Sequence, residues 1–258
     1  MEESFKRFEC VTYMNFSYCK FITEVPDMSQ FQNLRRLLFK RCHNLIKVHD
    51  SVGSLCKLVE LNLSRCTNLT GCPHEIKMTS LQKLHLRYCR SLDHFPHIVG
   101  KMDALRTIYA EDTAIKELPP SIGNLPRLES LVISSHKSLR ELPSSLFTLQ
   151  SLSWLNLRGI QPPSRKSLKK SLQENQPVIS RSNLKMLNLE NCCLLLEDLH
   201  LALNCFWNVQ ELILSGSDFV SLPECIIECA NMRNLVLNKL QEAKRHTRVA
   251  IKIGKYRG

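Results

Sequence analysis

The chain has 258 residues, of which 43% are hydrophobic and 23% charged, a balance that excludes an intrinsically disordered protein. Its 8 glycines and 11 prolines exclude a collagen-like or linker-like chain and leave few glycines for phosphate-binding loops. No run of about 18 apolar residues predicts a membrane-spanning helix. The charged first seven residues lack the apolar stretch of a secretory signal.

The formal net charge of +11 suggests a nucleic-acid-binding protein until the charges are located. Residues 161–183 carry a net charge of +4 and residues 239–258 a net charge of +6, so the rest of the chain carries +1. The basic character therefore belongs to two peripheral segments. We expect weak, sequence-independent association with nucleic acid at most, and no specific nucleic-acid partner.

The sequence repeats itself along most of its length. The pattern Leu58-x-x-Leu61-x-Leu63-x-x-Cys66-x-x-Leu69 recurs from Leu81 with every position filled by the same residue type. The repeats start, in chain order, at Val11, Leu34, Leu58, Leu81, Leu105, Leu128, Leu152, Leu184, Val209 and Met232. Successive starts are 23 to 25 residues apart, except for one interval of 32. This period lies within the range of about 20–29 residues that is typical of leucine-rich repeats.

The alternation x-Leu-x-Leu-x in each repeat predicts a short strand with its leucines on one face. Each repeat would add one strand to a parallel sheet on the concave side of a horseshoe, and would return along the other side through a second apolar set. The return path often starts at a proline, which favours an extended turn and stops a helix from continuing. Prolines stand there at Pro26, Pro73, Pro96, Pro119, Pro143 and Pro223. The predicted fold is an α/β leucine-rich repeat solenoid.

The repeat pattern also sets the expected domain boundaries. Residues 1–10 form a lead-in, and residues 11–240 form an array of about ten repeats, with a basic insertion at 161–183. Residues 241–258 keep no repeat phase and are expected to form an irregular basic tail. Because a solenoid needs both ends covered, we expect a truncated chain or an irregular end.

One repeat position carries five of the twelve cysteines, namely Cys19, Cys42, Cys66, Cys89 and Cys192. Such a position is expected to turn inward beneath the sheet, where a small residue with a polar edge can bond exposed backbone. We therefore predict a ladder of buried free thiols rather than a disulfide framework. The sequence has no P-loop, HExxH, GxSxG or paired CxxC motif, so we expect no catalysis, no cofactor and no metal in this chain.

The outward positions of the strands are candidates for binding a partner. Four early residues, Arg36, Lys40, Lys83 and Arg87, oppose Glu60 and would form a basic stripe of net charge +3, while Tyr109 and Trp154 would be exposed aromatics. Arginine and tryptophan are enriched in interface hot spots, and curved repeat arrays bind partners on their concave surface. The alternative is a solvated sheet face with incidental charge. The predicted partner-binding residues are Arg36, Lys40, Lys83, His85, Arg87, Tyr109, Trp154 and Arg158.

The chain resembles a known family over roughly residues 8–237. The stretches FITEVPDMSQFQNLRRL, CHNLIKVHDSVGSLCKLVELNLSRC, SLQKLHLRYCRSLDHFP and TAIKELPPSIGNLPRLESL are similar to the leucine-rich repeats of plant intracellular immune receptors. The most similar class carries an N-terminal Toll/interleukin-receptor domain and a nucleotide-binding switch domain. In that class the switch domain binds ADP or ATP and the N-terminal domain can cleave NAD, but no motif of either domain stands in this chain.

The resemblance implies a recognition and autoinhibitory sensor module that acts in the cytoplasm, or in the cytoplasm and nucleus. Its implied partners are a pathogen effector or a guarded host protein, and the nucleotide-binding domain of a full-length receptor. No membrane partner is implied. Two alternatives remain open at this point: a signalling scaffold resembling Ras-binding leucine-rich repeat proteins, and an extracellular receptor ectodomain. The ectodomain would require a signal peptide and paired cap cysteines, neither of which the sequence shows.

Overall fold

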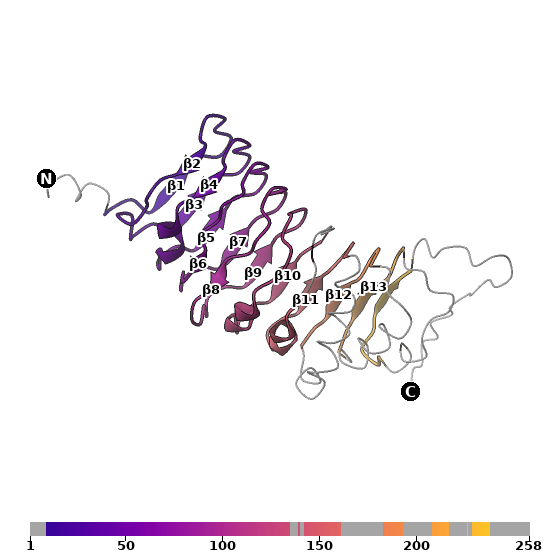
Figure 1. The fold of residues 1–258 in the computed structure, drawn as a ribbon. Coiled ribbons are helices and arrows are strands. Elements are labelled where there is room, and N and C mark those ends of the chain that lie inside the picture. Colours follow the sequence, from indigo (N-terminus) through magenta and orange to yellow (C-terminus); the bar gives the residue numbers. More distant parts are fainter. Residues whose placement is uncertain are drawn as a thin grey trace, which may run out of the picture.

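The structure, a computed structural model, describes residues 9–134, 139, 142–160, 183–192, 208–216, 226 and 229–237. Within these residues, strands of three residues each form one ten-stranded parallel sheet whose order follows the chain (Figure 1). They are β1 Tyr13–Asn15, β3 Arg36–Leu38, β5 Glu60–Asn62, β7 Lys83–His85, β9 Thr107–Tyr109, β10 Ser130–Val132, β11 Trp154–Asn156, β12 Met186–Asn188, β13 Glu211–Ile213 and β14 Asn234–Val236. The predicted leucine-rich repeat solenoid is confirmed.

Each strand pairs with the strand one repeat away, residue for residue. Leu61, for example, pairs with Leu37 on one side and Leu84 on the other. The middle residue of each strand points into the core, and these three leucines are at most 2% exposed. This in-register pairing places equivalent residues of successive repeats side by side, so each repeat buries its apolar face only against its neighbours.

The return side of the coil is built from short elements. Two pairs of two-residue strands lie there, β2 (Glu24–Val25) with β4 (Lys47–Val48) and β6 (Glu75–Ile76) with β8 (His97–Ile98). The described residues of the return side also form three 3₁₀ helices, which are η2 (Asp50–Ser54), η3 (Pro120–Asn124) and η4 (Ser144–Thr148).

The predicted role of the prolines is confirmed at the starts of η3 and η4. Pro119 and Pro143 are the N-caps of these helices, and both hold extended backbone at φ −68°. Each 3₁₀ helix is five residues long, so the coil turns back toward the sheet within one short segment. The apolar residues Ile122 and Leu146 of these helices are fully buried, as the second apolar set predicts.

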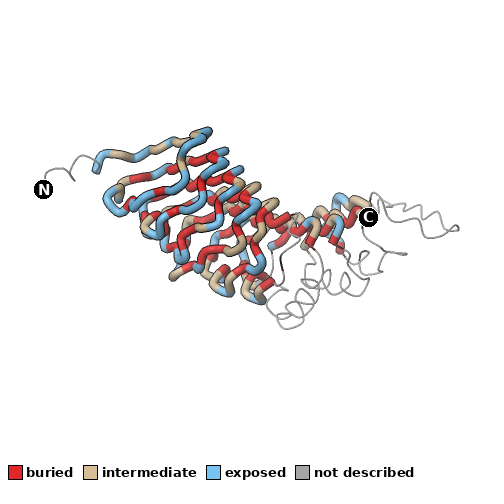
Figure 2. Tube along the Cα trace, turned by 45° about the horizontal axis from the view of Figure 1, so that its top comes forward, coloured by how far each residue is buried: buried red, intermediate tan, exposed pale blue. Residues whose placement is uncertain are grey.

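The core is a continuous column of apolar side chains between the sheet and the return segments. Among the described residues from residue 25 onward, buried residues recur from one turn of the coil to the next, as Figure 2 shows in red. The first repeat is less covered, because Met14, Phe16 and Ile22 are only partly buried against the column. Stacking of the two rings of Phe16 and Phe39, with centroids 5.0 Å apart, joins this first repeat to the second.

The predicted thiol ladder is confirmed at four of its five positions, whereas Cys19 of the first repeat is only partly buried. Cys42, Cys66, Cys89 and Cys192 are buried, and each thiol donates a hydrogen bond to a backbone carbonyl of the preceding repeat over 3.0 Å. Burial raises the pKa of the Cys42, Cys66 and Cys89 thiols, so these groups are neutral donors. The ladder therefore supplies one cross-repeat hydrogen bond per thiol and no reactive thiolate.

The predicted domain boundaries stay predictions. The lead-in up to residue 8, the insertion at 161–182 and the tail at 241–258 lie outside the described residues. Among the residues that the structure does describe, no helix combines the length and the apolar character needed to cross a membrane.

Candidate binding face on the concave sheet

The concave side of the sheet presents the first and third residue of each strand. In β7, Lys83 is exposed and His85 half-buried, while Leu84 between them points into the core. The third position is often an asparagine whose Oδ1 accepts the N–H of the residue two positions later, which closes a tight turn at the strand end. These pairs are Asn15 with Ser17, Asn62 with Ser64, Asn156 with Arg158 and Asn188 with Glu190.

A chain of polar contacts begins at the N-terminal end of this face. Arg36 donates through Nε and Nη2 to Oε2 of Glu60, at 3.0 and 2.9 Å. Oε1 of the same carboxylate lies 3.8 Å from Nε2 of His85. The Arg36 guanidinium also lies over the ring of Tyr13, 5.5 Å from its centroid. Side-chain contacts therefore add to the backbone pairing between the four neighbouring strands β1, β3, β5 and β7.

The chain continues around Tyr109 on β9. Its ring stacks on the ring of His85, with centroids 5.2 Å apart, and the Arg87 guanidinium lies 3.8 Å from the Tyr109 centroid. Nε of Arg87 is also 2.8 Å from Oε2 of Glu111. A cation–π contact and an ion pair therefore fix Arg87 at once, and Tyr109 is held between the histidine and the arginine.

His85 is the most unusual ionisable group of this face. Its Nε2 atom is buried and makes no hydrogen bond in the described part of the chain. Burial lowers the pKa of His85 below its ordinary value, and Arg87 and Lys83 act in the same direction, while Glu60 opposes them. The ring is therefore neutral near pH 7, and protonation would place a charge in a site that solvates it poorly.

The predicted basic stripe is divided into paired and unpaired cations. Arg36 and Arg87 are ion-paired with Glu60 and Glu111, which offsets their charge locally. Lys40 and Lys83 are exposed, and neither has an ion-pair partner among the described residues. Electrostatic attraction of a partner to this face would therefore depend mainly on the two lysines.

Two predicted site residues lie apart from this group. Trp154 and Arg158 belong to the β11 repeat, which β10 separates from Tyr109. Arg158 pairs with Glu190 at 3.3 Å. The sequence predicts Trp154 and Tyr109 as exposed, but the structure shows both half-buried, and the His85 ring and the Arg87 guanidinium cover part of the Tyr109 ring. The structure therefore brings together Arg36, His85, Arg87 and Tyr109, and leaves Trp154 and Arg158 as a second group.

Sequence reasoning missed one set of residues at the edge of the face. Tyr18, Arg41, Arg65 and Tyr88 each stand immediately before a cysteine of the ladder, and each has a positive φ between 62° and 67°. Their repeat position was a visible signal, because glycine or asparagine fills it in later repeats. Tyrosine and arginine do not indicate left-handed backbone, so the signal passed unnoticed.

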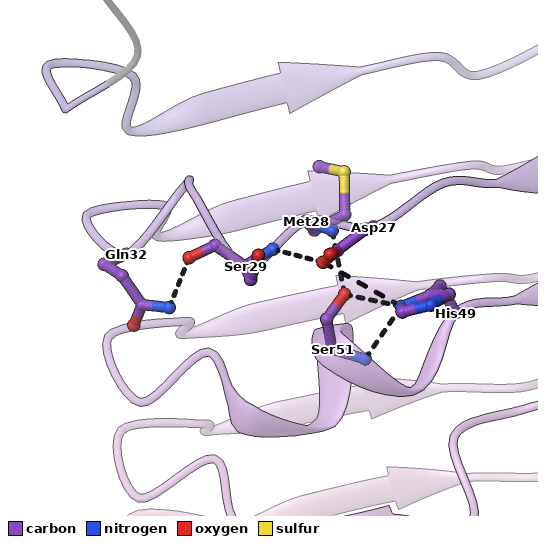
Figure 3. A network of polar contacts seen from close by, with 6 residues as sticks. All are labelled: Asp27, Met28, Ser29, Gln32, His49 and Ser51. Carbon is purple, nitrogen blue, oxygen red and sulfur yellow. Dashed lines mark hydrogen bonds and ion pairs between the residues drawn. The ribbon is translucent and has the colours of Figure 1, made fainter. Parts of the chain in front are cut away.

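An aspartate, a histidine and a serine also meet on the return side, as Figure 3 shows. Nδ1 of His49 is 3.9 Å from Oδ1 of Asp27 and 2.9 Å from Oγ of Ser51. A hydrolase triad needs the two ring nitrogens to contact different partners, whereas here both contacts fall on Nδ1. The same Nδ1 accepts the Ser51 N–H and so caps η2, and Ser51 Oγ accepts the Met28 N–H of the preceding repeat.

This grouping is therefore a structural link between repeats, and the bond from its serine to the preceding repeat recurs at η3. There Ser121 Oγ accepts the N–H of Ile98 at 2.9 Å and contacts Nδ1 of His97 at 3.2 Å. Within the described residues, no group of three or more histidine, cysteine or acidic side chains is arranged to hold a metal ion.

Comparison with known proteins assigns the chain to a family. Residues 77–254 match the family described as disease resistance protein RPS4B-like, leucine-rich repeats. The chain belongs to this family. It is 27% identical to TMV resistance protein N of Nicotiana glutinosa over 88% of the chain, and 30% identical to disease resistance protein RPP5 of Arabidopsis thaliana over 90% of the chain.

The matched relatives are much longer proteins. The chain spans 24% of the length of TMV resistance protein N and 15% of that of RPP5. It is also 38% identical to the Arabidopsis thaliana protein SUPPRESSOR OF npr1-1, CONSTITUTIVE 1, over 54% of the chain and 9% of that relative. The resemblance to plant immune receptors that the sequence motifs indicate is thereby confirmed.

Solved structures share the fold. The leucine-rich repeat domain of the type III effector XopL superposes with a TM-score of 0.61 at 24% identity, over 84% of this chain and 73% of that one. The functional domain of InlJ from Listeria monocytogenes, described as including a cysteine ladder, gives a TM-score of 0.50 at 16% identity, over 86% and 50%. At these identities the likeness concerns the solenoid architecture alone.

Proposed function

We propose that this chain is the recognition and autoinhibitory sensor module of a plant disease-resistance protein, and that it holds a protein partner on the concave sheet. Membership in the resistance-protein repeat family supports the assignment to a recognition module without catalysis of its own. Its partners would be a pathogen effector or a guarded host protein, and the nucleotide-binding domain of a full-length receptor. The module would act in the cytoplasm, or in the cytoplasm and nucleus.

The observation that carries the proposal is the pre-organised contact chain from Arg36 to Arg87. Arginines and aromatic rings are the side chains that contribute most to protein interfaces. Here the ring of Tyr109 and the guanidinium of Arg87 are already fixed by their neighbours, so they would lose little conformational freedom on binding. The unpaired Lys40 and Lys83 stand beside them and would steer an acidic surface of the partner toward the face.

The test is proximity labelling in plant cells with the wild-type chain and two charge-reversed variants. The concave variant is Lys40→Glu with Lys83→Glu. The matched control is Lys77→Glu with Lys101→Glu, which reverses two exposed lysines next to the return-side strands β6 and β8. We expect a protein partner that the wild type and the control enrich and the concave variant loses. Equal enrichment by all three chains would refute binding on the concave sheet.

A further inference from the structure

A ridge of large side chains runs along the edge of the sheet where the strands end. Its members are Tyr18, Arg41, Arg65 and Tyr88, one from each of the first four repeats. Their backbones are directly connected, because the N–H of each donates to the residue just before the next ridge position. These bonds join Tyr18 to the Lys40 carbonyl, Arg41 to that of Ser64 and Arg65 to that of Arg87, at 2.7–2.8 Å.

The ridge is ordered by contacts among its own members. The Arg41 guanidinium lies 5.8 Å from the centroid of the Tyr18 ring, and that of Arg65 lies 4.4 Å from the centroid of the Tyr88 ring. The two arginines thus occupy the middle of the ridge, and each forms a cation–π contact with the tyrosine of the neighbouring repeat. A guanidinium over an aromatic face keeps the N–H groups at its edge available for an anion.

The backbone at these positions is unfavourable for such residues. In the eight repeats whose residue at this position is described, that residue has positive φ, and the later repeats use residues suited to it, namely Asp112, Gly159, Asn191 and Gly216. Tyrosine and arginine adopt left-handed backbone at a free-energy cost, because their Cβ atom crowds the following carbonyl oxygen. Only the first four repeats bear this cost, and together they create the ridge.

The charge of the ridge is not offset nearby. Arg41 and Arg65 are exposed, and neither forms an ion pair with a described residue. Lys40, next to Arg41, is exposed and unpaired in the same way. At the far end of the ridge, Asp112 is engaged by Arg90 at 2.9 Å and Glu111 by Arg87 at 2.8 Å.

We infer that this ridge is a docking surface for a short acidic segment of a partner protein, whose carboxylates are bound by the forked N–H groups of Arg41 and Arg65. Arginine binds a carboxylate through two parallel hydrogen bonds, and two guanidiniums on adjacent repeats can take two carboxylates of one segment. The surface lies on the rim beyond the concave face, so it does not depend on the proposed function of that face.

The alternative anion, the phosphate backbone of a nucleic acid, fits the ridge less well. A long polyanion along this edge would meet Glu111 and Asp112 directly after Tyr88. The two tyrosine rings that could stack on bases are each covered on one side by an arginine. The ridge covers four repeats and has carboxylates at one end, so its length and charge suit a short acidic peptide.

The experiment uses the full chain and an oligoglutamate peptide that carries a photo-reactive benzophenone group. Cross-linked sites are mapped by mass spectrometry, which separates the ridge from the basic segments 161–183 and 239–258. We expect cross-links near Tyr18 to Tyr88 with the wild type. Arg41→Gln with Arg65→Gln should reduce them about tenfold or more, because two charge-assisted hydrogen-bond donors are lost.

Two further variants make the result specific. Arg35→Gln with Arg127→Gln removes the same charge from exposed arginines that precede the strands, and should leave ridge cross-linking unchanged. Arg41→Lys with Arg65→Lys keeps the charge and loses the fork, so it should give an intermediate signal, and it decides the matter if the glutamine variant is misfolded by circular dichroism. Cross-links confined to the two basic segments, or an equal loss in the Arg35/Arg127 control, would overturn the proposal. So would displacement of the peptide from the ridge by duplex DNA at lower concentration than by free oligoglutamate.

Discussion

The thiol of Cys66 donates a hydrogen bond to the backbone carbonyl of Phe39, 3.0 Å away in the preceding repeat. The same carbonyl accepts the N–H of Cys42 at 3.2 Å, which closes the turn of its own repeat. One oxygen therefore serves both a local turn and the contact between repeats. The arrangement recurs between Cys89 and Leu63, so the ladder couples the geometry of each turn to the stacking of the next repeat.

Replacing Cys66 with arginine should unfold the repeats around it. The side chain is fully buried, and an unpaired charge there costs several kcal/mol. We expect a loss of about 3–5 kcal/mol in the free energy of unfolding, measured by urea denaturation followed by circular dichroism. The control Cys10→Arg changes an exposed cysteine and should leave the urea midpoint in place. A soluble Cys66→Arg protein with a wild-type midpoint would contradict the inward placement of the ladder.

Alkylation should distinguish buried thiols from exposed ones. Cys10 and Cys56 are exposed, whereas Cys72 and Cys89 are buried, and burial raises the pKa of the Cys72 thiol to about 12. With iodoacetamide near pH 8, the first two should react at least about tenfold faster than the second two, because the thiolate is the reactive form. The measurement is mass spectrometry of the native protein over time. Equal rates would mean that the repeats open faster than the reagent reacts.

The half-buried ring of His85, with its buried Nε2 atom, should make stability depend on pH below neutrality. Its pKa is lowered in the folded chain, so between that value and the ordinary 6.5 the unfolded chain binds a proton that the folded chain does not. The free energy of unfolding should therefore fall as the pH is lowered from 7 through 6.5, and stay reduced below the folded pKa. The readout is the urea midpoint across this range.

Two variants assign that effect to the correct histidine. His85→Gln removes the titrating ring and should flatten the dependence between pH 7 and 5. His43→Gln, at an exposed histidine, should keep the wild-type slope. If the urea midpoint of the His85→Gln protein falls as steeply as that of the wild type between pH 7 and 5, the assignment to His85 is wrong.

A pair of glycines at the same position of two 3₁₀ helices offers a steric test. A Cβ at Gly53 of η2 would overlap the carbonyl oxygen of Glu75, which backbone cannot easily yield. At Gly123 of η3 the nearest atom would be Cβ of Ser145 at 3.1 Å, a milder contact. We expect Gly53→Ala to lower the unfolding free energy by about 1–3 kcal/mol and Gly123→Ala by less than half of that. Thermal unfolding of the two variants measures the difference between their unfolding free energies. Equal decreases in the two variants would contradict the close packing of Gly53 in η2 against Glu75.

The fold could be predicted from the sequence because the information is periodic. A single leucine such as Leu61 or Leu84 predicts little on its own. The constant interval between equivalent leucines, however, predicts where the strands lie, how they pair and which face of the sheet is buried. The proline positions predict the extended backbone that precedes η3 and η4. The two-residue strands such as β6 have no sequence pattern that predicts them. Two residues are too few to display an alternation.

The candidate site was only half predictable. Alternation places Arg36, His85 and Tyr109 on one face, because side-chain direction follows from strand geometry. It does not say that Glu60 joins Arg36 to His85, since that depends on rotamers and on burial around the ring. The ridge at Tyr18 to Tyr88 depends on backbone torsion, which tyrosine and arginine do not reveal.

Binding on the concave sheet can be checked by hydroxyl-radical footprinting of the chain with and without the partner captured in plant cells. We expect that oxidation of Tyr13, Tyr109 and Trp154 falls in the complex, while His49 and His97 on the return side are oxidised as in the free chain. Protection of His49 and His97 with unchanged oxidation of Tyr109 and Trp154 would contradict it.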